Sequence, residues 1–287
     1  MKNRAWLFLT PALILVSLSA FIPLMTVVNY SLHVLFPGSI PYFVGLQNFR
    51  EVLNDEVFMG CIKRQILFAL QILIIQIPMG LAIALAMPKK GNWLTLMIVL
   101  LGIPLLIPYN VTGMVWRVFT RMDLGVVPRV FASLGYDYRP VEHVADAWWT
   151  TVVMDVWHWV PLVTLLCFAG LQTIPDAYYQ AAKIDGASTW ATFRKVTLPK
   201  LRYVLTIAVL LRTMDSFNIY SEPYILTGGG PGTSTLFMSI YVSSQAAGGF
   251  DMGTGAALSV VYLVIVVLLC YLLYTMMLNV GKGGVAK

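Results

Sequence analysis

Residues 258–273 read LSVVYLVIVVLLCYLL, and this stretch decides the fold class. It carries no charged residue, and its apolar flanks extend it to the length of about 20 residues that a membrane-spanning helix needs. A transmembrane β-strand would instead alternate apolar and polar residues over about ten positions. The continuous run contradicts that alternation, so it predicts a helix that crosses a membrane.

The rest of the chain has the same character. Of its 287 residues, 59% are hydrophobic and 11% are charged, and the mean hydropathy is +0.78. A soluble domain is about 45–50% apolar and about 25% charged, so this composition excludes a soluble or disordered protein. We expect six spanning helices, at about residues 6–28, 66–87, 93–116, 147–170, 203–221 and 255–278. The pattern predicts an all-α, polytopic membrane protein in which residues 1–287 form one transmembrane domain.

The distribution of Lys and Arg predicts that both termini are cytoplasmic. Six spans place the two termini on the same side of the membrane. With the termini inside, the cytoplasmic segments hold eleven of the 19 basic residues and two of the 13 acidic residues. Their net charge is then +9, against −3 for the rest of the chain, and cytoplasmic loops carry the excess of Lys and Arg. The basic excess therefore reflects membrane orientation, and we expect no nucleic-acid partner.

The sequence shows no motif for bond chemistry. The three cysteines lack disulfide or zinc spacing, and the three histidines are isolated. Residues 228–234 read GGGPGTS, which is similar to a phosphate-binding loop but has no lysine, so we expect a turn. An intramembrane enzyme would need a nucleophile and a base, which no motif supplies. We predict no catalytic residue, no metal site and no cofactor bound by this chain.

Residues 174–199 are the most informative segment, and they read IPDAYYQAAKIDGASTWATFRKVTLP. This composition predicts a short helix, a break at Gly186 and a second short helix that ends before Pro199. Small residues allow a close approach to another protein, and the aromatic residues supply anchors. An amphipathic helix lying on the membrane surface would have a similar composition. The residues alone leave both interpretations open.

The segment resembles the EAA loop of the membrane subunits of binding-protein-dependent ABC importers. That motif reads Glu-Ala-Ala, three residues, Gly, nine residues, then Ile-x-Leu-Pro. The matching residues are Ala181, Ala182, Gly186, Leu198 and Pro199, while Val196 replaces Ile and Gln180 replaces Glu. The resemblance implies a coupling helix that inserts into a cleft of an ATPase subunit. The docking residues that it implies are Tyr179, Gln180, Ala181, Ala182, Asp185, Gly186 and Ala187.

Further blocks resemble the carbohydrate-uptake branch of that family, the permeases of the maltose and glycerol-phosphate type. These blocks are GLQNF at 45–49, WRVF at 116–119, AGLQTIP at 169–175 and TGGGPGTST at 227–235. The resemblance implies a type I ABC importer permease fold in the inner (cytoplasmic) membrane of a bacterium. It also implies a second, non-identical permease, two ATPase subunits that bind ATP and Mg, a periplasmic solute-binding protein and contact with membrane lipid.

Polar residues inside the expected spans mark a candidate solute pathway. A charge at mid-membrane costs about 2.5–3.5 kcal/mol on insertion scales, so it usually faces the bundle interior or a cavity. We predict that the solute-binding residues are Asp155, Trp159, Asp215, Asn218, Tyr109 and Asn110. The alternative is that Arg212 and Asp215 form an i, i+3 pair with a structural role only. We expect Asp155→Asn to leave no unpaired charge, and Asp215→Asn to strand Arg212.

These observations predict the permease subunit of an ATP-driven importer for a sugar, polyol or glycerol-like solute. A neutral solute is favoured, because Arg212 is the only basic residue placed centrally in an expected span. The alternative class is a self-contained secondary transporter or channel. That class would explain the spans and the buried charges, but it would not explain the coupling segment.

Overall fold

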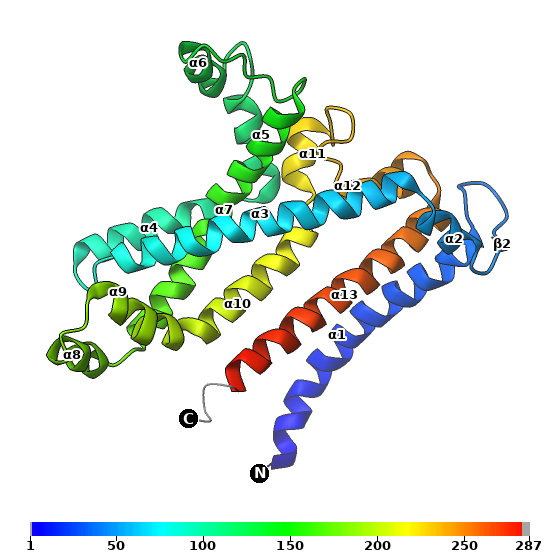
Figure 1. The fold of residues 1–287 in the computed structure, drawn as a ribbon. Helices are drawn as coiled ribbons and strands as arrows, with labels where there is room; N and C mark the ends of the chain where they lie inside the picture. The colour runs from blue at the N-terminus through cyan, green and yellow to red at the C-terminus, as the bar shows by residue number, and fades with distance from the viewer. Residues whose placement is uncertain (1, 283–287) are drawn as a thin grey trace. The chain divides into compact units, whose positions relative to one another are not determined.

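Four long apolar helices contain four of the expected segments. The computed structural model describes the backbone of residues 2–282 and the side chains of residues 9–275. The four helices are α1 (Lys2–Ser31), α3 (Glu56–Ala86), α7 (Val144–Gln172) and α13 (Met252–Lys282) (Figure 1). Each has a stretch long and apolar enough to cross a membrane. The all-α class is therefore confirmed.

The third expected segment is not one helix. It consists of α4 (Asn92–Leu106) and α5 (Tyr109–Phe119), whose axes differ by 94°. The proline ring fixes the φ of Pro108, and it disfavours helical geometry at the preceding Ile107. Ile107 accordingly has an extended backbone, with φ −81° and ψ 124°. The prediction of a continuous helix over 93–116 is therefore wrong.

The fifth expected segment, 203–221, is also divided. Helix α10 (Leu198–Phe217) ends before the expected boundary, and α11 (Ser221–Thr227) follows after three residues. Pro223 lies in the first turn of α11, where proline is tolerated because the N–H groups of that turn have no intrahelical partner. By length and composition, the described residues hold four candidate spans, or five if α4 and α5 count as one. Helix α10 is long enough to cross a membrane, but it carries four charged residues and is not among the candidate spans.

The chain forms two compact units, and the first combines Met1–Cys61 with Met238–Val267. This unit contains α1, α2 (Gln47–Leu53), the start of α3, α12 (Met238–Ser243), a π-helical turn η2 (Ser244–Gly248) and α13 up to Val267. Strands β1 (His33–Val34) and β2 (Tyr42–Phe43) form a small antiparallel pair. Buried Asn48 donates to the carbonyls of Ser31 at 2.9 Å and His33 at 3.0 Å. This side chain joins α2 to the end of α1.

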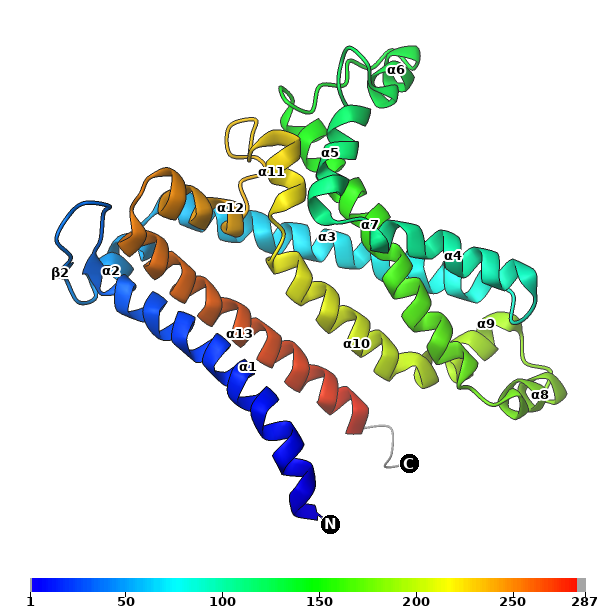
Figure 2. The ribbon, with the colours of Figure 1, turned by 180° about the vertical axis from the view of Figure 1, so that it is seen from behind.

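The second unit is built around α7 and carries both candidate sites. Helices α4 and α10 pack along α7, and α11 packs against α5 and α7. A Cβ on Gly80 of α3 would lie 2.6 Å from Val163, and a Cβ on Gly170 of α7 would lie 2.8 Å from Leu201 and Val204. These glycines allow the close helix approach typical of membrane bundles. The segment with α8 (Asp176–Ile184) and α9 (Thr189–Thr192) lies at one end of α7, and α6 (Val126–Ser133) lies towards the other (Figures 1 and 2).

Candidate functional site

The expected coupling segment folds as a short helix, a glycine turn and a second helix. Helix α8 spans Asp176–Ile184, and α9 spans Thr189–Thr192. Between them Gly186 has a φ of +66°, in the left-handed region that favours glycine. The N–H of Ala187 returns to the carbonyl of Ala182 at 2.9 Å, which closes the C-terminal end of α8. Ser188 caps α9 by accepting from the N–H of Ala191.

Helix α9 is short, but the helical backbone continues past Pro199, so the expectation that it ends before this proline is wrong. A π-helical turn, η1 (Phe193–Thr197), connects α9 directly to α10, and Pro199 lies in the first turn of α10. The N–H of Leu198 donates to the carbonyl of Phe193, five residues back. A proline inside a regular α-helix would clash with the carbonyl four residues earlier. The carbonyl four residues before Pro199 is that of Lys195, which lies within the wider turn.

Helix α8 has two different faces. Tyr179 and Lys183, one turn apart, line a cavity of about 1040 Å³ behind the helix. Ala177, Ala181 and Ile184 share the other face and are exposed, Ile184 at 86%. The predicted docking residues do not include Ile184, although its spacing from Ala177 and Ala181 places it on the same helical face.

The structure places the seven predicted docking residues in three environments. Those that line the cavity are Tyr179, Gly186 and Ala187. Ala182 is buried at 9% exposure. Gln180, Ala181 and Asp185 are exposed outside the cavity. The Tyr179 hydroxyl lies 3.4 Å from the Thr197 hydroxyl, which links α8 to the start of α10.

A cluster of buried polar groups lies where α3, α7 and α10 meet. Arg212 of α10 is fully buried, and its Nη2 lies 2.8 Å from Oδ1 of Asp155. Its Nε donates to Oε1 of Gln76 at 2.8 Å, and its Nη1 lies 3.3 Å from Oδ2 of Asp215. The ring of Trp159 lies 4.4 Å from the guanidinium carbon. Each of the three guanidinium nitrogens therefore has a side-chain partner, and the group also lies over an aromatic ring.

This cluster revises the expected roles of the two aspartates. Asp155 is 4% exposed and accepts from both Arg212 and Gln76, the latter at 2.7 Å. The side chain of Asp215 is 39% exposed and makes the longer contact. The main partner of Arg212 is thus Asp155, and not the i+3 neighbour that the sequence indicated. Asp155→Asn is the change that leaves a buried charge poorly paired.

Next to this cluster is a cavity of about 110 Å³. It is lined by Tyr109, Asp155, Trp159, Asp215, Asn218, Ile219, Tyr220, Ser221 and Glu222. Five of the six predicted solute-binding residues are therefore brought together. Asn110 is exposed and does not line this cavity, so its inclusion is not supported.

The predicted solute-binding residues do not include four that line this cavity, namely Ile219, Tyr220, Ser221 and Glu222. The expected fifth span continues as one helix to residue 221. Ile219 and Tyr220 lie in the break between α10 and α11, and Ser221 and Glu222 begin α11. Pro223 was the available signal, since proline in this position commonly starts a helix. The break turns the chain so that these residues face Asp155 and Trp159 across the cavity.

Two other sequence features have structural roles. In the glycine-rich block, Gly228 ends α11 with a φ of +67°, and its N–H donates to the Tyr224 carbonyl at 2.8 Å. The expected turn is confirmed. His158 is buried, with Nδ1 3.2 Å from the Thr112 hydroxyl. Within the described residues, no group of three His, Cys, Asp or Glu side chains is arranged to hold a metal ion.

Solved structures show the same fold. A crystal structure of a bacterial ABC transporter involved in the import of the acidic polysaccharide alginate contains a chain that superposes with a TM-score of 0.82, at 18% identity, covering 96% of each chain. A chain in the crystal structure of bacterial alginate ABC transporter in complex with alginate pentasaccharide-bound periplasmic protein also superposes with a TM-score of 0.82. It is 19% identical, and the match covers 98% of this chain and 96% of that chain.

Sequence relatives and a family match agree with the fold. The trehalose/maltose transport system permease protein MalF of Thermococcus litoralis is 34% identical, over 91% of this chain and 89% of that protein. The sulfoquinovosyl glycerol transport system permease protein SmoG of Agrobacterium fabrum is 32% identical, over 90% of this chain and 84% of that protein. Residues 76–283 match the family described as binding-protein-dependent transport system inner membrane component. The chain therefore belongs to this family of membrane permease subunits.

Proposed function

We propose that the chain is one of two non-identical permeases in an ATP-driven importer of a neutral sugar, polyol or glycerol-like solute. A periplasmic binding protein delivers the solute, and two separate ATPase subunits bind ATP and Mg. The observation that carries this proposal is α8, a helix at the end of α7 with an exposed apolar face. Family membership sets aside the alternative of a self-contained secondary transporter or channel.

The charge distribution supports a cytoplasmic position for α8. Helix α3 ends at Ala86 and is followed by Lys89 and Lys90. The segment 174–202 adds five more basic residues and only two acidic ones. Because cytoplasmic loops carry excess Lys and Arg, we place this end of the bundle, and both termini, on the cytoplasmic side of a bacterial inner membrane.

The connections of α8 support a role in transmitting movement. Its Tyr179 hydroxyl contacts Thr197, and α9 continues through η1 into α10 without a loop. Helix α10 carries Arg212 and Asp215, and α7 carries Asp155. A displacement of α8 by an ATPase would therefore reach the polar cavity through packed helices. The chain itself needs no bond-making chemistry for this role.

The charges around the cavity support a neutral solute. Within the described residues, no Lys or Arg lines the cavity, whereas Asp155, Asp215 and Glu222 do. Arg212 is already shared between two of these carboxylates. An anionic solute would meet negative side chains, while Tyr109, Trp159 and Asn218 offer aromatic faces and hydrogen bonds. Of the two permease relatives named above, MalF is named for the neutral sugars trehalose and maltose, whereas SmoG is named for sulfoquinovosyl glycerol, a sulfonated sugar derivative. The relatives therefore support a sugar-like solute, and the charges around the cavity alone favour a neutral one.

The size of the cavity supports a contribution from the second permease. Small-molecule sites have volumes of about 300–1,000 Å³, and this cavity has about 110 Å³. It would serve as one part of a site that another subunit completes.

Site-directed crosslinking tests the docking role of α8. Cysteines at Ala181 and Ile184, on the exposed face, should crosslink to the ATPase subunit in the intact complex. A cysteine at Lys183, which lines the cavity behind the helix, is the matched control and should not crosslink. Crosslinking only from Lys183, or from none of the three positions, would contradict the proposed docking face.

Uptake competition tests the solute class. A labelled sugar imported by the reconstituted complex should be displaced by neutral sugars or polyols, and much less by uronic acids or sugar phosphates. Preferential displacement by the acidic compounds would contradict the neutral-solute proposal.

A further inference from the structure

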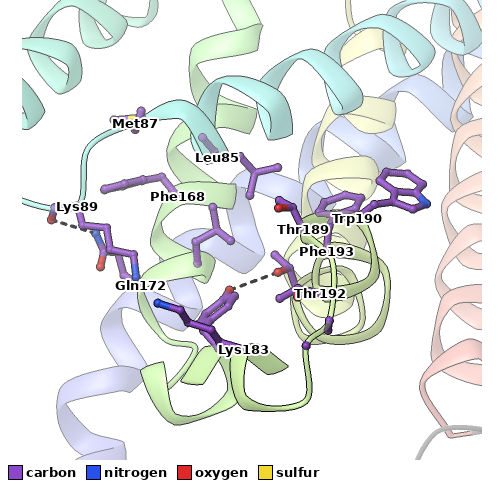
Figure 3. Close-up of a pocket in the computed structure, with 16 residues that line it drawn as sticks. Leu85, Met87, Lys89, Phe168, Gln172, Lys183, Thr189, Trp190, Thr192 and Phe193 are labelled. Atoms are coloured by element: carbon purple, nitrogen blue, oxygen red, sulfur yellow. Dashed lines mark hydrogen bonds between the residues drawn. The ribbon is translucent and has the colours of Figure 1, made fainter. Parts of the chain in front are cut away.

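The large cavity behind α8 has an apolar wall. Its volume is about 1040 Å³, and it is lined by residues from the ends of α3 and α7, from α8 and from α9 with η1 (Figure 3). Leu85, Phe168 and Leu171 form part of this wall, together with Phe193. Leu85 is 46% exposed, so apolar surface remains uncovered there.

The charged residues that line the cavity are basic. Lys89 and Lys183 both line it, and no acidic residue does within the described part of the chain. Lys89 is held 3.1 Å from Asp176, but their side chains are 71% and 75% exposed, and such exposed pairs contribute only about 0–1 kcal/mol. Lys183 forms no ion pair with any described residue. Both ammonium groups are therefore available to an anion.

The cavity lies where two apolar helices end. Helices α3 and α7 are candidate spans, and they end at Ala86 and Gln172. Trp190 also lines the cavity and is 68% exposed. Tryptophan is enriched at the level where hydrocarbon meets the lipid headgroups. The apolar wall then faces the hydrocarbon side and the lysines face the headgroup side.

We propose that this cavity binds an anionic phospholipid. Its phosphate lies between Lys89 and Lys183, and one acyl chain lies along Leu85 and Phe168. A free phosphate would leave the apolar wall unused, and a zwitterionic lipid would bring its own cation to a site that already holds two. Basic pockets between helices on the cytoplasmic side of a membrane bind anionic headgroups in this way. The bound lipid would support α8 from behind while its other face stays exposed for docking.

Native mass spectrometry of the full chain, purified with its accompanying subunits, tests this proposal. The complex is titrated with phosphatidylglycerol or phosphatidylcholine of the same acyl chains. Lys89→Gln combined with Lys183→Gln should weaken phosphatidylglycerol binding about thirtyfold, since each lysine near an anionic lipid contributes about 1 kcal/mol and about 1.4 kcal/mol is a factor of ten. Lys90→Gln, an exposed lysine next to Lys89 that does not line the cavity, is the matched control.

A second variant tests the apolar wall independently. Leu85→Trp should occupy the acyl-chain position and reduce phosphatidylglycerol binding while both lysines remain. Inorganic phosphate at millimolar concentration should not displace the lipid. Equal binding of the two lipids by the unaltered protein, or equal losses from the double variant and Lys90→Gln, would overturn the proposal. A crosslink from Leu85→Cys to an ATPase subunit would assign the cavity to a protein contact instead.

Discussion

Asp155→Asn should destabilise the permease more than Asp215→Asn, although both remove one carboxylate near the same arginine. Asp155 lies 2.8 Å from Arg212, and their side chains are 4% and 0% exposed. Removing one partner of a buried ion pair costs about 3–5 kcal/mol. Arg212 keeps Asp215 at 3.3 Å, so we expect the lower end, about 3 kcal/mol. Asp215→Asn removes a pair whose acid is 39% exposed, and should cost about 1 kcal/mol.

Thermal denaturation of the solubilised complex measures this difference. For a chain of this size, 1 kcal/mol shifts Tm by about 2–4 °C. We therefore expect Tm to fall by about 6–12 °C for Asp155→Asn and by about 2–4 °C for Asp215→Asn. The double variant Asp155→Asn with Arg212→Gln should recover part of the loss, because no buried charge then lacks a partner.

Uptake measured with the same samples separates structure from solute binding. Asp215→Asn should keep the complex assembled, so a change in its solute selectivity would report on the cavity itself. Loss of uptake by Asp155→Asn together with loss of assembled protein would mark Asp155 as structural. A larger Tm decrease for Asp215→Asn than for Asp155→Asn would refute the assignment of Asp155 as the main partner of Arg212.

Three further outcomes follow from other parts of the molecule. Gly170→Ala should destabilise the complex by about 1–3 kcal/mol through overpacking between α7 and α10, whereas Gly102→Ala, which meets nothing within 4 Å, should be neutral or stabilising in thermal denaturation. Asn48→Ala should cost about 1–3 kcal/mol by leaving two carbonyls without their donor, and hydrogen exchange should rise at residues 31–35. Cysteines at Lys90 and Thr189 should react with an impermeant reagent only after permeabilisation, and labelling of intact cells would contradict the proposed topology.

The positions of the helices could largely be predicted from apolar length, but their interruptions could not. Hydrophobicity does not distinguish a continuous span from one bent at Pro108, because the side chains on both sides of the bend are apolar. Bundle packing can also absorb a proline, as in α3 and α7. Pro108 and Pro223 mark the positions of the bend and of the break before α11, but tertiary packing decides which prolines interrupt a helix.

The candidate sites could likewise be predicted from the sequence only in part. Five cavity residues could be selected because polar side chains inside spans usually face the interior. Their pairing could not, because the distance from Arg212 to Asp155 depends on the packing of α10 against α7. In the coupling segment, the motif spacing located α8 and Gly186, but the two different faces of α8 depend on how it packs on its neighbours.

The π-helical turn at residues 193–197 sets the rotational phase between the docking segment and the polar cavity. Such a turn is equivalent to one extra residue in an α-helix, and each residue turns the helix by about 100°. Deleting one residue there would let α9 and α10 join as a regular helix with Arg212 and Asp215 near their present direction relative to α9, because the wider turn absorbs one extra residue. Deleting one residue from the regular part of α10 before residue 212 would instead turn both side chains by about 100°. The turn therefore tolerates the loss of one residue, whereas the regular helix between it and residue 212 is constrained in length.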